Sequence, residues 1–449
     1  MDFVESCRQL IGLDTTPSQG TKEIGLFLRD YCAKKSLNVE IIEESWGGCE
    51  QSSIIIRHPS APNNIKEFLL QTHLDTSDPG PFGLWKTTGN NPFDAHIVDG
   101  RIFGLGAADT KLDILCKIEA LSAIGNKTNW KRAPIVVGTH SEELGMMGAL
   151  KLIRKNKINA DIALIGEPSN LKLITAGKGI ATVEFTIPYQ EDELAYKREH
   201  NLSESTTTQS RIFHGRAAHS STPQLGESAI KKMFDYLLQL PEGLTVIEID
   251  GGVNFNTVPA NAFIELDLKT GHSDPVSRKL AKLYKTILDL EDHFLQYEDK
   301  RFTPRHPTLN IGLVKTFEDH IFISGTCRIS PSVSNEVYEK WMQQLAQTCF
   351  DISASFKITD YKRPFTTQEE SEFAQNCRDL LQKLDLNPET TTQSSTNEAS
   401  LFSRTGIECI CFGAGAREGN IHTPNEHVLI SDLHKATEFY KQAIERFCL

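Results

Sequence analysis

The chain has 449 residues, which is long enough for two or three domains with substantial hydrophobic cores. Its apolar content of 39% and charged content of 24% are ordinary for a globular enzyme. The net charge of −12 argues against nucleic acid and against an anionic membrane surface as partners. Every apolar run is shorter than the about 18 residues that a membrane-spanning helix needs, so we expect no membrane association.

The first part of the chain alternates helix-like and strand-like patterns. Apolar residues recur at helical spacing within residues 1–35, around 109–124 and around 147–156. We expect Lys111 and Asp113 to be charges on the surface of the second of these helices. Short runs typical of strands lie between the helices: VEIIE, SSIIIR, EFLLQT, APIVVGT and ADIALIG. This alternation predicts a mixed or parallel sheet with helices on both faces.

The pattern changes after Gly177 and returns near the C-terminus. A strand is expected at 180–187, a polar surface insertion at 189–210, and two strand-turn-helix sets further along. Helices are then expected at 369–385 and 431–447. We therefore predict an α/β fold with an open mixed sheet, formed by residues 1–177 and 366–449 and split by an inserted α+β domain at 178–365.

The cysteines and the N-terminal segment bear on the cellular compartment. The ten cysteines show no CxxC pair, and scattered free thiols fit a reducing cytosol. The segment MDFVESCRQLIG lacks the basic and apolar regions of a signal peptide. We expect a cytoplasmic protein.

Acidic and imidazole side chains stand at or just beyond the ends of apolar runs, or in loops, in a fixed order along the chain. They are His73, Asp75, Asp109, Glu142, Glu143, Glu167 and His422. An open α/β sheet presents its ligands at such positions, in a crevice at the carboxyl ends of its strands. Two histidines and three carboxylates suit two zinc-like ions that share one bridging carboxylate. One further carboxylate, Glu142, is left to move protons, so the pattern indicates a metal-dependent hydrolase.

Each motif also has an ordinary structural interpretation when it is taken alone. His73 could simply end a strand, Asp109 could be a helix N-cap, and Glu142-Glu143 could be a solvated acidic pair. The functional interpretation of the pair is that adjacent side chains point in different directions, so one can bind metal while the other faces water. Asp75 is placed to orient the His73 ring, because a metal-binding imidazole usually gives its second N–H to a carboxylate or a carbonyl.

Taken together, these motifs resemble the dinuclear zinc aminoacylase and carboxypeptidase superfamily, which includes acetylornithine deacetylase, succinyl-diaminopimelate desuccinylase and glutamate carboxypeptidase. The resemblance extends over nearly the whole chain and includes WKTTGNNPFDAHIVDGRIFGLGAADTK, FHGRAAHSSTPQLGESAI and IDGGVNFNTVPANAF. It departs from the family pattern at Leu112, where a glycine is common, and in the length of the inserted domain. A longer inserted domain is a feature of dipeptidase branches and puts dimerisation in doubt.

The resemblance implies a role for each residue of the predicted centre. His73 and Glu167 would bind one ion, Glu143 and His422 the other, and Asp109 would bridge the two. Glu142 would be the general base. The implied cofactors are two divalent ions, with zinc favoured and cobalt or manganese as alternatives.

The resemblance further makes the inserted domain a lid and dimerisation domain, so a homodimer through this domain is an implied partner. His219 would stabilise the oxyanion and Asn256 would contact substrate. The family's carboxylate-binding arginine has two candidate counterparts here, Lys269 and Arg328. Glu398, in TNEAS, could meet a cationic side chain of the substrate or could be a polar surface turn.

The reaction implied is hydrolysis of an N-acyl amino acid, as in acetylornithine deacetylase, by metal-activated water with Glu142 as base. The substrate would be a small N-acyl amino acid or a dipeptide. The alternative is a metallo-dipeptidase or carboxypeptidase of the same superfamily. A non-catalytic relative that binds a ligand is a more distant alternative, which the complete set of ligands argues against.

Overall fold

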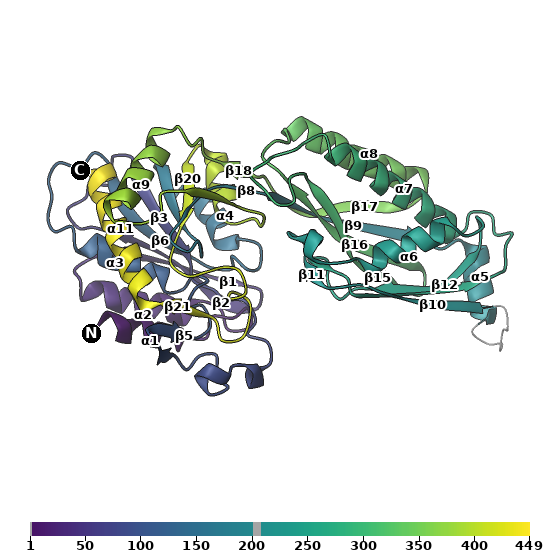
Figure 1. The fold of residues 1–449 in the computed structure, drawn as a ribbon, viewed down its shortest axis with the longest axis horizontal. Coiled ribbons are helices and arrows are strands. Elements are labelled where there is room, and N and C mark those ends of the chain that lie inside the picture. The colour runs from purple at the N-terminus through teal and green to yellow at the C-terminus, as the bar shows by residue number, and fades with distance from the viewer. Residues whose placement is uncertain (1, 201–207) are drawn as a thin grey trace. The chain divides into compact units, whose positions relative to one another are not determined.

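The computed structural model describes residues 2–200 and 208–449, and the chain divides into two compact units (Figure 1). The first unit comprises Met1–Ala176, Phe365–Thr392 and Asn397–Leu449. The second comprises Gly177–Pro364 and Gln393–Thr396. Part of the predicted polar insertion, residues 201–207, lies outside the described residues, and the part before it forms helix α5 (Glu191–His200).

An open mixed sheet of nine strands is the centre of the first unit. Its four middle strands run parallel in the order β6, β3, β7 and β20. The remaining strands pair at the edges, antiparallel where β2 meets β6 and where β20 meets β8. The strand bounds, in the order of the sheet, are β1 Asn38–Trp46, β2 Cys49–Arg57, β6 Ala133–Thr139, β3 Glu67–His73, β7 Ala160–Gly166, β20 Glu408–Phe412, β8 Leu173–Gly177 and β18 Phe365–Thr366, with β19 Thr390–Gln393 paired to β8.

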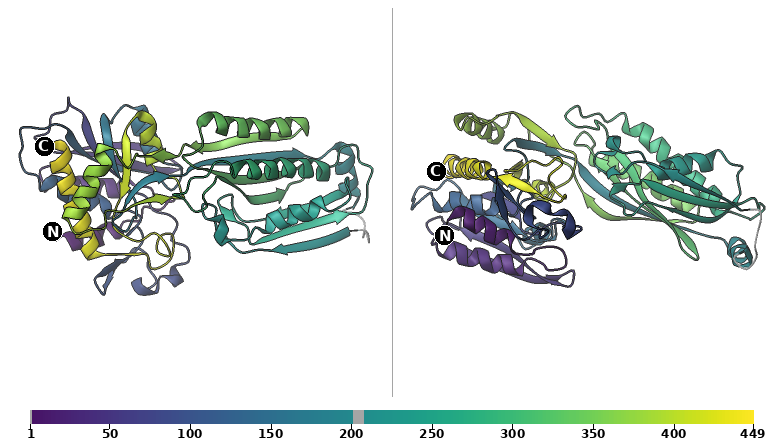
Figure 2. Two further views of the ribbon diagram at one scale, coloured as in Figure 1. Left: turned by 45° about the horizontal axis from the view of Figure 1, so that its top comes forward. Right: turned by 60° about the horizontal axis from the view of Figure 1, so that its bottom comes forward.

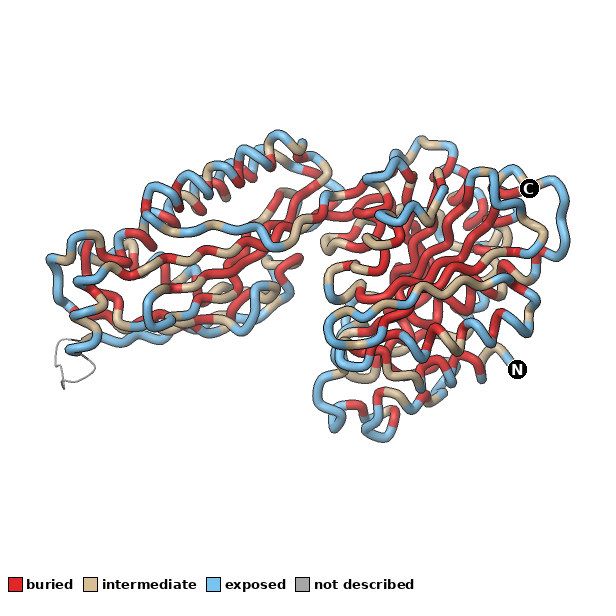
Figure 3. Tube along the Cα trace, turned by 180° about the vertical axis from the view of Figure 1, so that it is seen from behind, coloured by how far each residue is buried: buried red, intermediate tan, exposed pale blue. Residues whose placement is uncertain are grey.

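Helices cover both faces of this sheet, because successive side chains of each central strand are apolar on both sides. In β3, Phe68 and Leu70 join the core beneath α1, α2, α3, α9 and α11, whereas Leu69 joins the core beneath α4 and α10. Strands β3 and β6 are buried along their whole length, and β7 and β20 are buried except for one half-buried residue each (Figure 3). The helix bounds are α1 Phe3–Ile11, α2 Lys22–Ala33, α3 Asp113–Ser122, α4 Met147–Arg154, α9 Glu372–Lys383, α10 Ala399–Phe402 and α11 Ile430–Cys448.

The first unit also contains a small three-stranded sheet with the strand order β21-β5-β4. Its strands are β4 His96–Val98, β5 Arg101–Phe103 and β21 His427–Leu429. The pairing of β21 with β5 brings the segment after His422 next to the segment before Asp109. Two residues predicted as metal ligands therefore sit on loops that are joined by backbone hydrogen bonds.

The helix expected at 109–124 is shorter than predicted, and the expectation about its charges is wrong. It begins at Asp113, because the amides of Ala108 and Asp109 are bound by the carboxylate of Glu426 in a loop. Lys111 and Asp113 are buried rather than on the surface. The physical reason is that α3 packs against α11 on one side and against β3 and β6 on the other.

The second unit is an antiparallel sheet of seven strands with a layer of helices on one face, which makes it α+β (Figures 1 and 2). Side chains of α6, α7 and α8 form its core with the inward residues of the strands. Ser228 and Ser334 cap α6 and α8 by accepting the N–H of Lys231 and Val337. The strands, in sheet order, are β10 Thr208–His214, β14 Asn261–Asp267, β12 Thr245–Gly251, β15 Thr308–Thr316, β16 His320–Ile329, β9 Gly179–Pro188 and β17 Ser355–Lys362, and the helices are α6 Ala229–Leu238, α7 Val276–Phe294 and α8 Asn335–Asp351.

The predicted fold class is confirmed: an α/β unit with an open mixed sheet is combined with an inserted α+β unit. None of the helices in residues 2–200 and 208–449 has the length and apolar character that crossing a membrane requires. All ten cysteines are free thiols, and all but Cys49 are buried.

Candidate metal centre

Four neighbouring parallel strands of the first unit deliver the predicted ligands other than Asp109 at or beyond their carboxyl ends. His73 is the last residue of β3, and its strand partner in β6 is Thr139, three residues before Glu142. Glu167 directly follows β7, and the loop that carries His422 follows β20. Parallel neighbours in one sheet end at the same edge, so residues far apart in the chain meet there.

Asp109 lies between the two predicted histidine ligands. Its Oδ1 is 3.2 Å from Nε2 of His73, and its Oδ2 is 3.2 Å from Nε2 of His422. The same His422 nitrogen is 3.0 Å from Oε1 of Glu143. The ligand atoms of Asp109, Glu143 and His422 all lie within 4.8 Å of one another, which is a suitable size for a cation site. Each carboxylate oxygen of Asp109 thus faces a different imidazole.

The carboxylate of Asp75 holds the acidic pair at the end of β6. It accepts the backbone N–H of Glu142 at 2.9 Å through Oδ1 and that of Glu143 at 3.0 Å through Oδ2. The ring of His73 contacts the main chain of Asp75 instead, with Nδ1 3.0 Å from the carbonyl oxygen and 3.8 Å from the carboxylate. Asp75 therefore orients His73 through its backbone and orients the Glu142-Glu143 turn through its side chain.

Glu167 is paired with a residue that sequence reasoning missed. Nη1 of Arg417 lies 3.1 Å from Oε2 of Glu167. Arg417 stands in the loop 413–426, five residues before His422, and brings a positive charge to the acidic cluster. The only sequence signal for a role of Arg417 was its position in a glycine-rich loop near the predicted ligand His422. A single arginine in a loop has no periodicity that would show what it contacts.

The charges of this cluster favour the binding of cations. Burial disfavours a charged His73, yet the hydrogen bond to Asp109 raises its pKa well above the usual value. Hydrogen bonds to Asp109 and Glu143 raise the pKa of His422 to about 11. Burial alone would raise the pKa of Asp109, but the hydrogen bonds from both imidazoles lower it. The carboxylates of Asp109 and Glu143 attract positive charge, and the mixed nitrogen and oxygen donors fit zinc-like divalent ions.

Glu142 is a half-buried carboxyl group beside the ligands, and the structure gives it no hydrogen bond to an imidazole. Burial raises its pKa well above the usual value; the charge of His73 opposes this, and Glu143, Glu167 and Glu398 raise the pKa further. A carboxyl group with a raised pKa is able to accept and return a proton near neutral pH.

Glu398 lies in the interior of the first unit, at the start of α10, with 1% of its surface exposed. Its Oε2 accepts hydrogen bonds from the amide of Gln71 and, at 2.9 Å, from the hydroxyl of Thr139. Burial raises its pKa to about 8. The surface-turn interpretation of this residue is therefore wrong, whereas its contact with a cationic substrate group stays a prediction.

The second unit brings three of the other predicted residues together. Oδ1 of Asn256 accepts a hydrogen bond of 2.8 Å from Nη2 of Arg328, and Nδ2 of Asn256 lies 3.1 Å from Nε2 of His219. The short strands β11 (Ala218–His219) and β13 (Thr257–Val258) hold this arrangement. Arg328 is 3% exposed. Lys269 is not part of this group: it is exposed, and its ammonium lies 5.6 Å from the ring of Tyr196.

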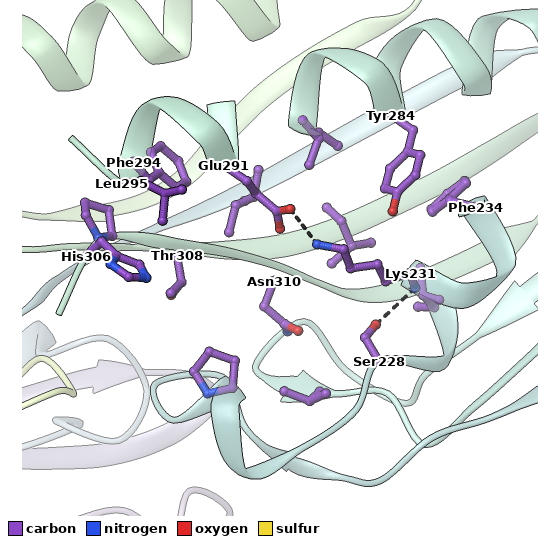
Figure 4. A pocket seen from close by; sticks show the side chains of 17 residues that line it. Ser228, Lys231, Phe234, Tyr284, Glu291, Phe294, Leu295, His306, Thr308 and Asn310 are labelled. Carbon is purple, nitrogen blue, oxygen red and sulfur yellow. Dashed lines mark hydrogen bonds and ion pairs between the residues drawn. The ribbon is translucent and has the colours of Figure 1, made fainter. Parts of the chain in front are cut away.

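A cavity of about 340 Å³ lies elsewhere in the second unit, between α6, α7 and β15 (Figure 4). Its walls are mostly apolar, and Lys231 forms a 2.5 Å ion pair with Glu291 at its edge. Only one carboxylate, Glu291, and one imidazole, His306, line it. This lining lacks the two imidazoles and several carboxylates of the predicted centre, which lie at the sheet edge of the first unit.

The candidate site combines imidazoles and carboxylates with one further carboxyl group, that of Glu142, at the carboxyl edge of an open α/β sheet. This combination is typical of a metal-dependent hydrolase. Residues 69–446 match the sequence profile of Peptidase family M20/M25/M40, and the chain belongs to this family. The resemblance stated from the motifs is thereby confirmed.

Known relatives agree with this assignment. The acetylornithine deacetylase of Myxococcus xanthus is 24% identical over 361 residues, which cover 78% of this chain and 73% of that protein. The solved aminoacylhistidine dipeptidase of Vibrio alginolyticus matches with a TM-score of 0.65 at 15% identity, over 99% of this chain and 96% of that chain. An M20 family metallo-carboxypeptidase from Sulfolobus solfataricus matches with a TM-score of 0.64 at 16% identity, over 100% and 99%. The structural matches show a shared fold.

Proposed function

We propose that this protein hydrolyses the amide bond of N-acyl amino acids, as an acetylornithine deacetylase does, with two divalent metal ions and Glu142 as general base. The observation that carries the proposal is the position of Asp109, whose two carboxylate oxygens face one predicted histidine ligand each. One ion would be held by His73 and Glu167 and the other by Glu143 and His422, with Asp109 between them. Zinc is the favoured metal, because it accepts this mixture of nitrogen and oxygen donors.

The chain's own groups account for the proton movements of such a reaction. When bound, divalent ions supply Lewis acidity to the scissile carbonyl and to water. Glu142 takes a proton from the attacking water and delivers it to the leaving amine. Asp75 keeps Glu142 and Glu143 in fixed orientations through their backbone amides, so the base and the adjacent ligand face different directions.

Residues of the second unit would bind the substrate. Arg328 is preferred over Lys269 for the α-carboxylate, since its guanidinium adjoins Asn256 and Ser220 in one polar group. An arginine also matches a carboxylate with two parallel hydrogen bonds. His219 would stabilise the oxyanion, with its Nδ1 held 2.7 Å from the hydroxyl of Ser221 and its Nε2 next to Asn256.

The alternative function is a metallo-dipeptidase or carboxypeptidase, which the solved dipeptidase and carboxypeptidase of the same fold favour. A panel of N-acetyl amino acids, N-succinyl amino acids and dipeptides, tested on metal-loaded protein, separates the two. A kcat/KM for N-acetyl substrates at least tenfold above that for dipeptides is the expected result. The reverse order would establish the alternative.

We further propose a cytoplasmic location and a homodimer formed through the second unit. The free thiols support the first, because secreted proteins commonly oxidise theirs. Family resemblance alone supports the second. Sedimentation equilibrium at micromolar concentration decides it, and a monomer would exclude the dimer.

Metal loading should give two divalent ions per chain. Loading at pH 7 should also release protons, because hydrogen bonds to carboxylates raise the pKa of both imidazoles and an imidazole must lose its proton to bind a metal ion. Elemental analysis gives the stoichiometry, and titration calorimetry in buffers of different ionisation enthalpy gives the protons. Binding of a single ion that is unaffected by Asp109→Ala would contradict the dinuclear centre.

Arg328→Met is expected to raise KM for substrates with a free α-carboxylate by about 10- to 100-fold, because a charge-assisted hydrogen bond contributes about 1.5–3 kcal/mol. Lys269→Met is the matched control and should leave KM within about twofold, since exposed charges contribute little. Substrates with the α-carboxylate converted to an amide should show little effect of either variant. A larger effect of Lys269→Met would assign the carboxylate to Lys269 instead.

A further inference from the structure

Glu426 is a buried carboxylate that bonds the backbone of the loop carrying Asp109. Its side chain is 1% exposed. Oε1 accepts the N–H groups of Ala108 at 2.8 Å and of Asp109 at 2.9 Å, and Oε2 accepts that of Gly106 at 3.2 Å. Three backbone donors of one short loop thus converge on a single side chain from a segment more than 300 residues away.

This side chain joins the loops of two predicted metal ligands. Glu426 stands four residues after His422, and its carbonyl oxygen also accepts the N–H of Gly104 at 3.0 Å. Glu426 binds the backbone N–H of Asp109, and the side-chain carboxylate of the same Asp109 faces both His73 and His422. The loops are therefore connected at their backbones and through the Glu426 carboxylate.

The loop has little room for another arrangement. Gly106 has φ of +80°, and a Cβ at this position would lie 2.7 Å from Cγ2 of Thr76 and 3.0 Å from Cβ of Lys111. The residues that carry the three bonded amides are buried, and buried N–H groups need an acceptor. A carboxylate with two oxygens can serve all three amides, which neutral side chains of the same length cannot.

We propose that Glu426 is a positioning residue of the metal centre, which fixes Asp109 between the two ion sites by binding the amides of its loop. The inference rests on the proposed function, since it assumes that Asp109 bridges two ions. Both carboxylate oxygens of Glu426 accept backbone N–H groups, and Glu426 is not one of the predicted metal ligands. Residues that orient ligands in this way typically change metal affinity by about 10- to 100-fold when they are replaced.

Glu426→Gln is the most direct test, because it preserves size and removes one acceptor. The glutamine carbonyl can still accept two N–H groups, but its NH₂ group is a donor and cannot accept the third. We expect the affinity for Zn²⁺ in competition with a chelator to fall by about 10- to 100-fold. The visible absorption of the Co²⁺-loaded protein should also change, because it reports the geometry of the ligands. Glu418→Gln, an exposed position of the same loop, is the matched control and should change neither.

Amide hydrogen exchange gives a measurement that does not require metal. In chelator-treated protein, the amides of Gly106, Ala108 and Asp109 should exchange faster in Glu426→Gln than in the wild type, with no change in Glu418→Gln. Glu426→Asp keeps the charge on a shorter side chain and should fall between the wild type and Glu426→Gln in both measurements. This milder variant keeps the test decisive if Glu426→Gln folds poorly.

The inference is overturned if Glu426→Gln binds Zn²⁺ with wild-type affinity and gives the wild-type Co²⁺ spectrum. It is also overturned if the loss of affinity disappears once the folded fraction is taken into account, since a purely structural role would produce that result. Failure of the proposed function has a different signature: the wild-type protein would then bind no pair of ions, whatever the exchange of the three amides.

Discussion

Replacing Glu142 with alanine is expected to lower kcat by about 10²- to 10⁴-fold while both metal ions stay bound, which is the size of effect typical of a lost general base. Glu142 is the carboxylate of the acidic pair that forms no hydrogen bond or ion pair with an imidazole among the described residues, whereas Glu143 lies 3.0 Å from His422. Single-turnover kinetics on metal-loaded protein measure the loss. Elemental analysis of the same sample verifies that two ions are present.

Glu143→Ala is the matched control, because it removes the neighbouring carboxylate of the same turn. This variant should lose metal, and its activity should recover in part with excess metal ion. The opposite pattern, with metal lost from Glu142→Ala and retained in Glu143→Ala, would show that the roles of the two residues are exchanged. The turn makes such an exchange geometrically possible, because both amides are held by Asp75.

Lys117→Met is expected to destabilise the first unit by about 3–5 kcal/mol, because it leaves a buried carboxylate without its cation. Lys117 is 0% exposed, and its ammonium lies 2.7 Å from Asp113 and 2.8 Å from the hydroxyl of Thr72. Asp113 also accepts hydrogen bonds from Thr72 and Tyr440. Urea denaturation in the presence of chelator, followed by circular dichroism, measures the loss as a lower midpoint.

Two controls separate the buried pair from a general effect of the substitution. Lys441→Met removes a half-exposed ammonium that lies 3.6 Å from the half-exposed Glu438 on α11, and it should cost less than about 1 kcal/mol. Adding Asp113→Asn to Lys117→Met should restore part of the lost stability, since the uncompensated charge is then gone. If the double variant is less stable than Lys117→Met alone, the unpaired carboxylate is not the cause.

The ion pair of Lys117 and Asp113 lies next to the residues that precede two predicted metal ligands. Thr72 precedes His73, and a Cβ at Gly166, the residue before Glu167, would lie 2.4 Å from Oδ2 of Asp113 and 2.8 Å from Nζ of Lys117. The glycine is required by this close approach. Sequence reasoning treated Asp113 as a surface charge, because helical periodicity alone does not reveal that a helix is covered on both sides.

Several residues of the centre lie in patterns that local sequence makes visible. A run of apolar residues that ends at a histidine or an acid, as in LLQTHLDT and ALIGEPSN, marks a strand that leaves the core at a polar edge. His73, Glu142, Glu143 and Glu167 were found in this way, and each follows a buried strand in the structure. The order of the motifs along the chain also indicated the family.

The sequence did not predict which residues contact these side chains. Arg417 meets Glu167 across 250 residues, and Glu426 meets Ala108 and Asp109 across more than 300. A single charged residue in a loop has the same local appearance whether it faces water or a buried amide. The choice between Lys269 and Arg328 was open for the same reason, and only their positions relative to Asn256 distinguish them.

By itself, the sequence determined the types of the elements, the α/β class with its insertion, and which strand ends carry the predicted metal ligands, because these depend on patterns within a few residues. The tertiary structure decided the strand order β6-β3-β7-β20, which brings four of those ends to one edge of the sheet. It also decided which charges are buried, namely Lys111, Asp113, Lys117 and Glu426. Burial and pairing are properties of segments that meet only when the chain folds, and a charge becomes costly to remove only after its surroundings have excluded water.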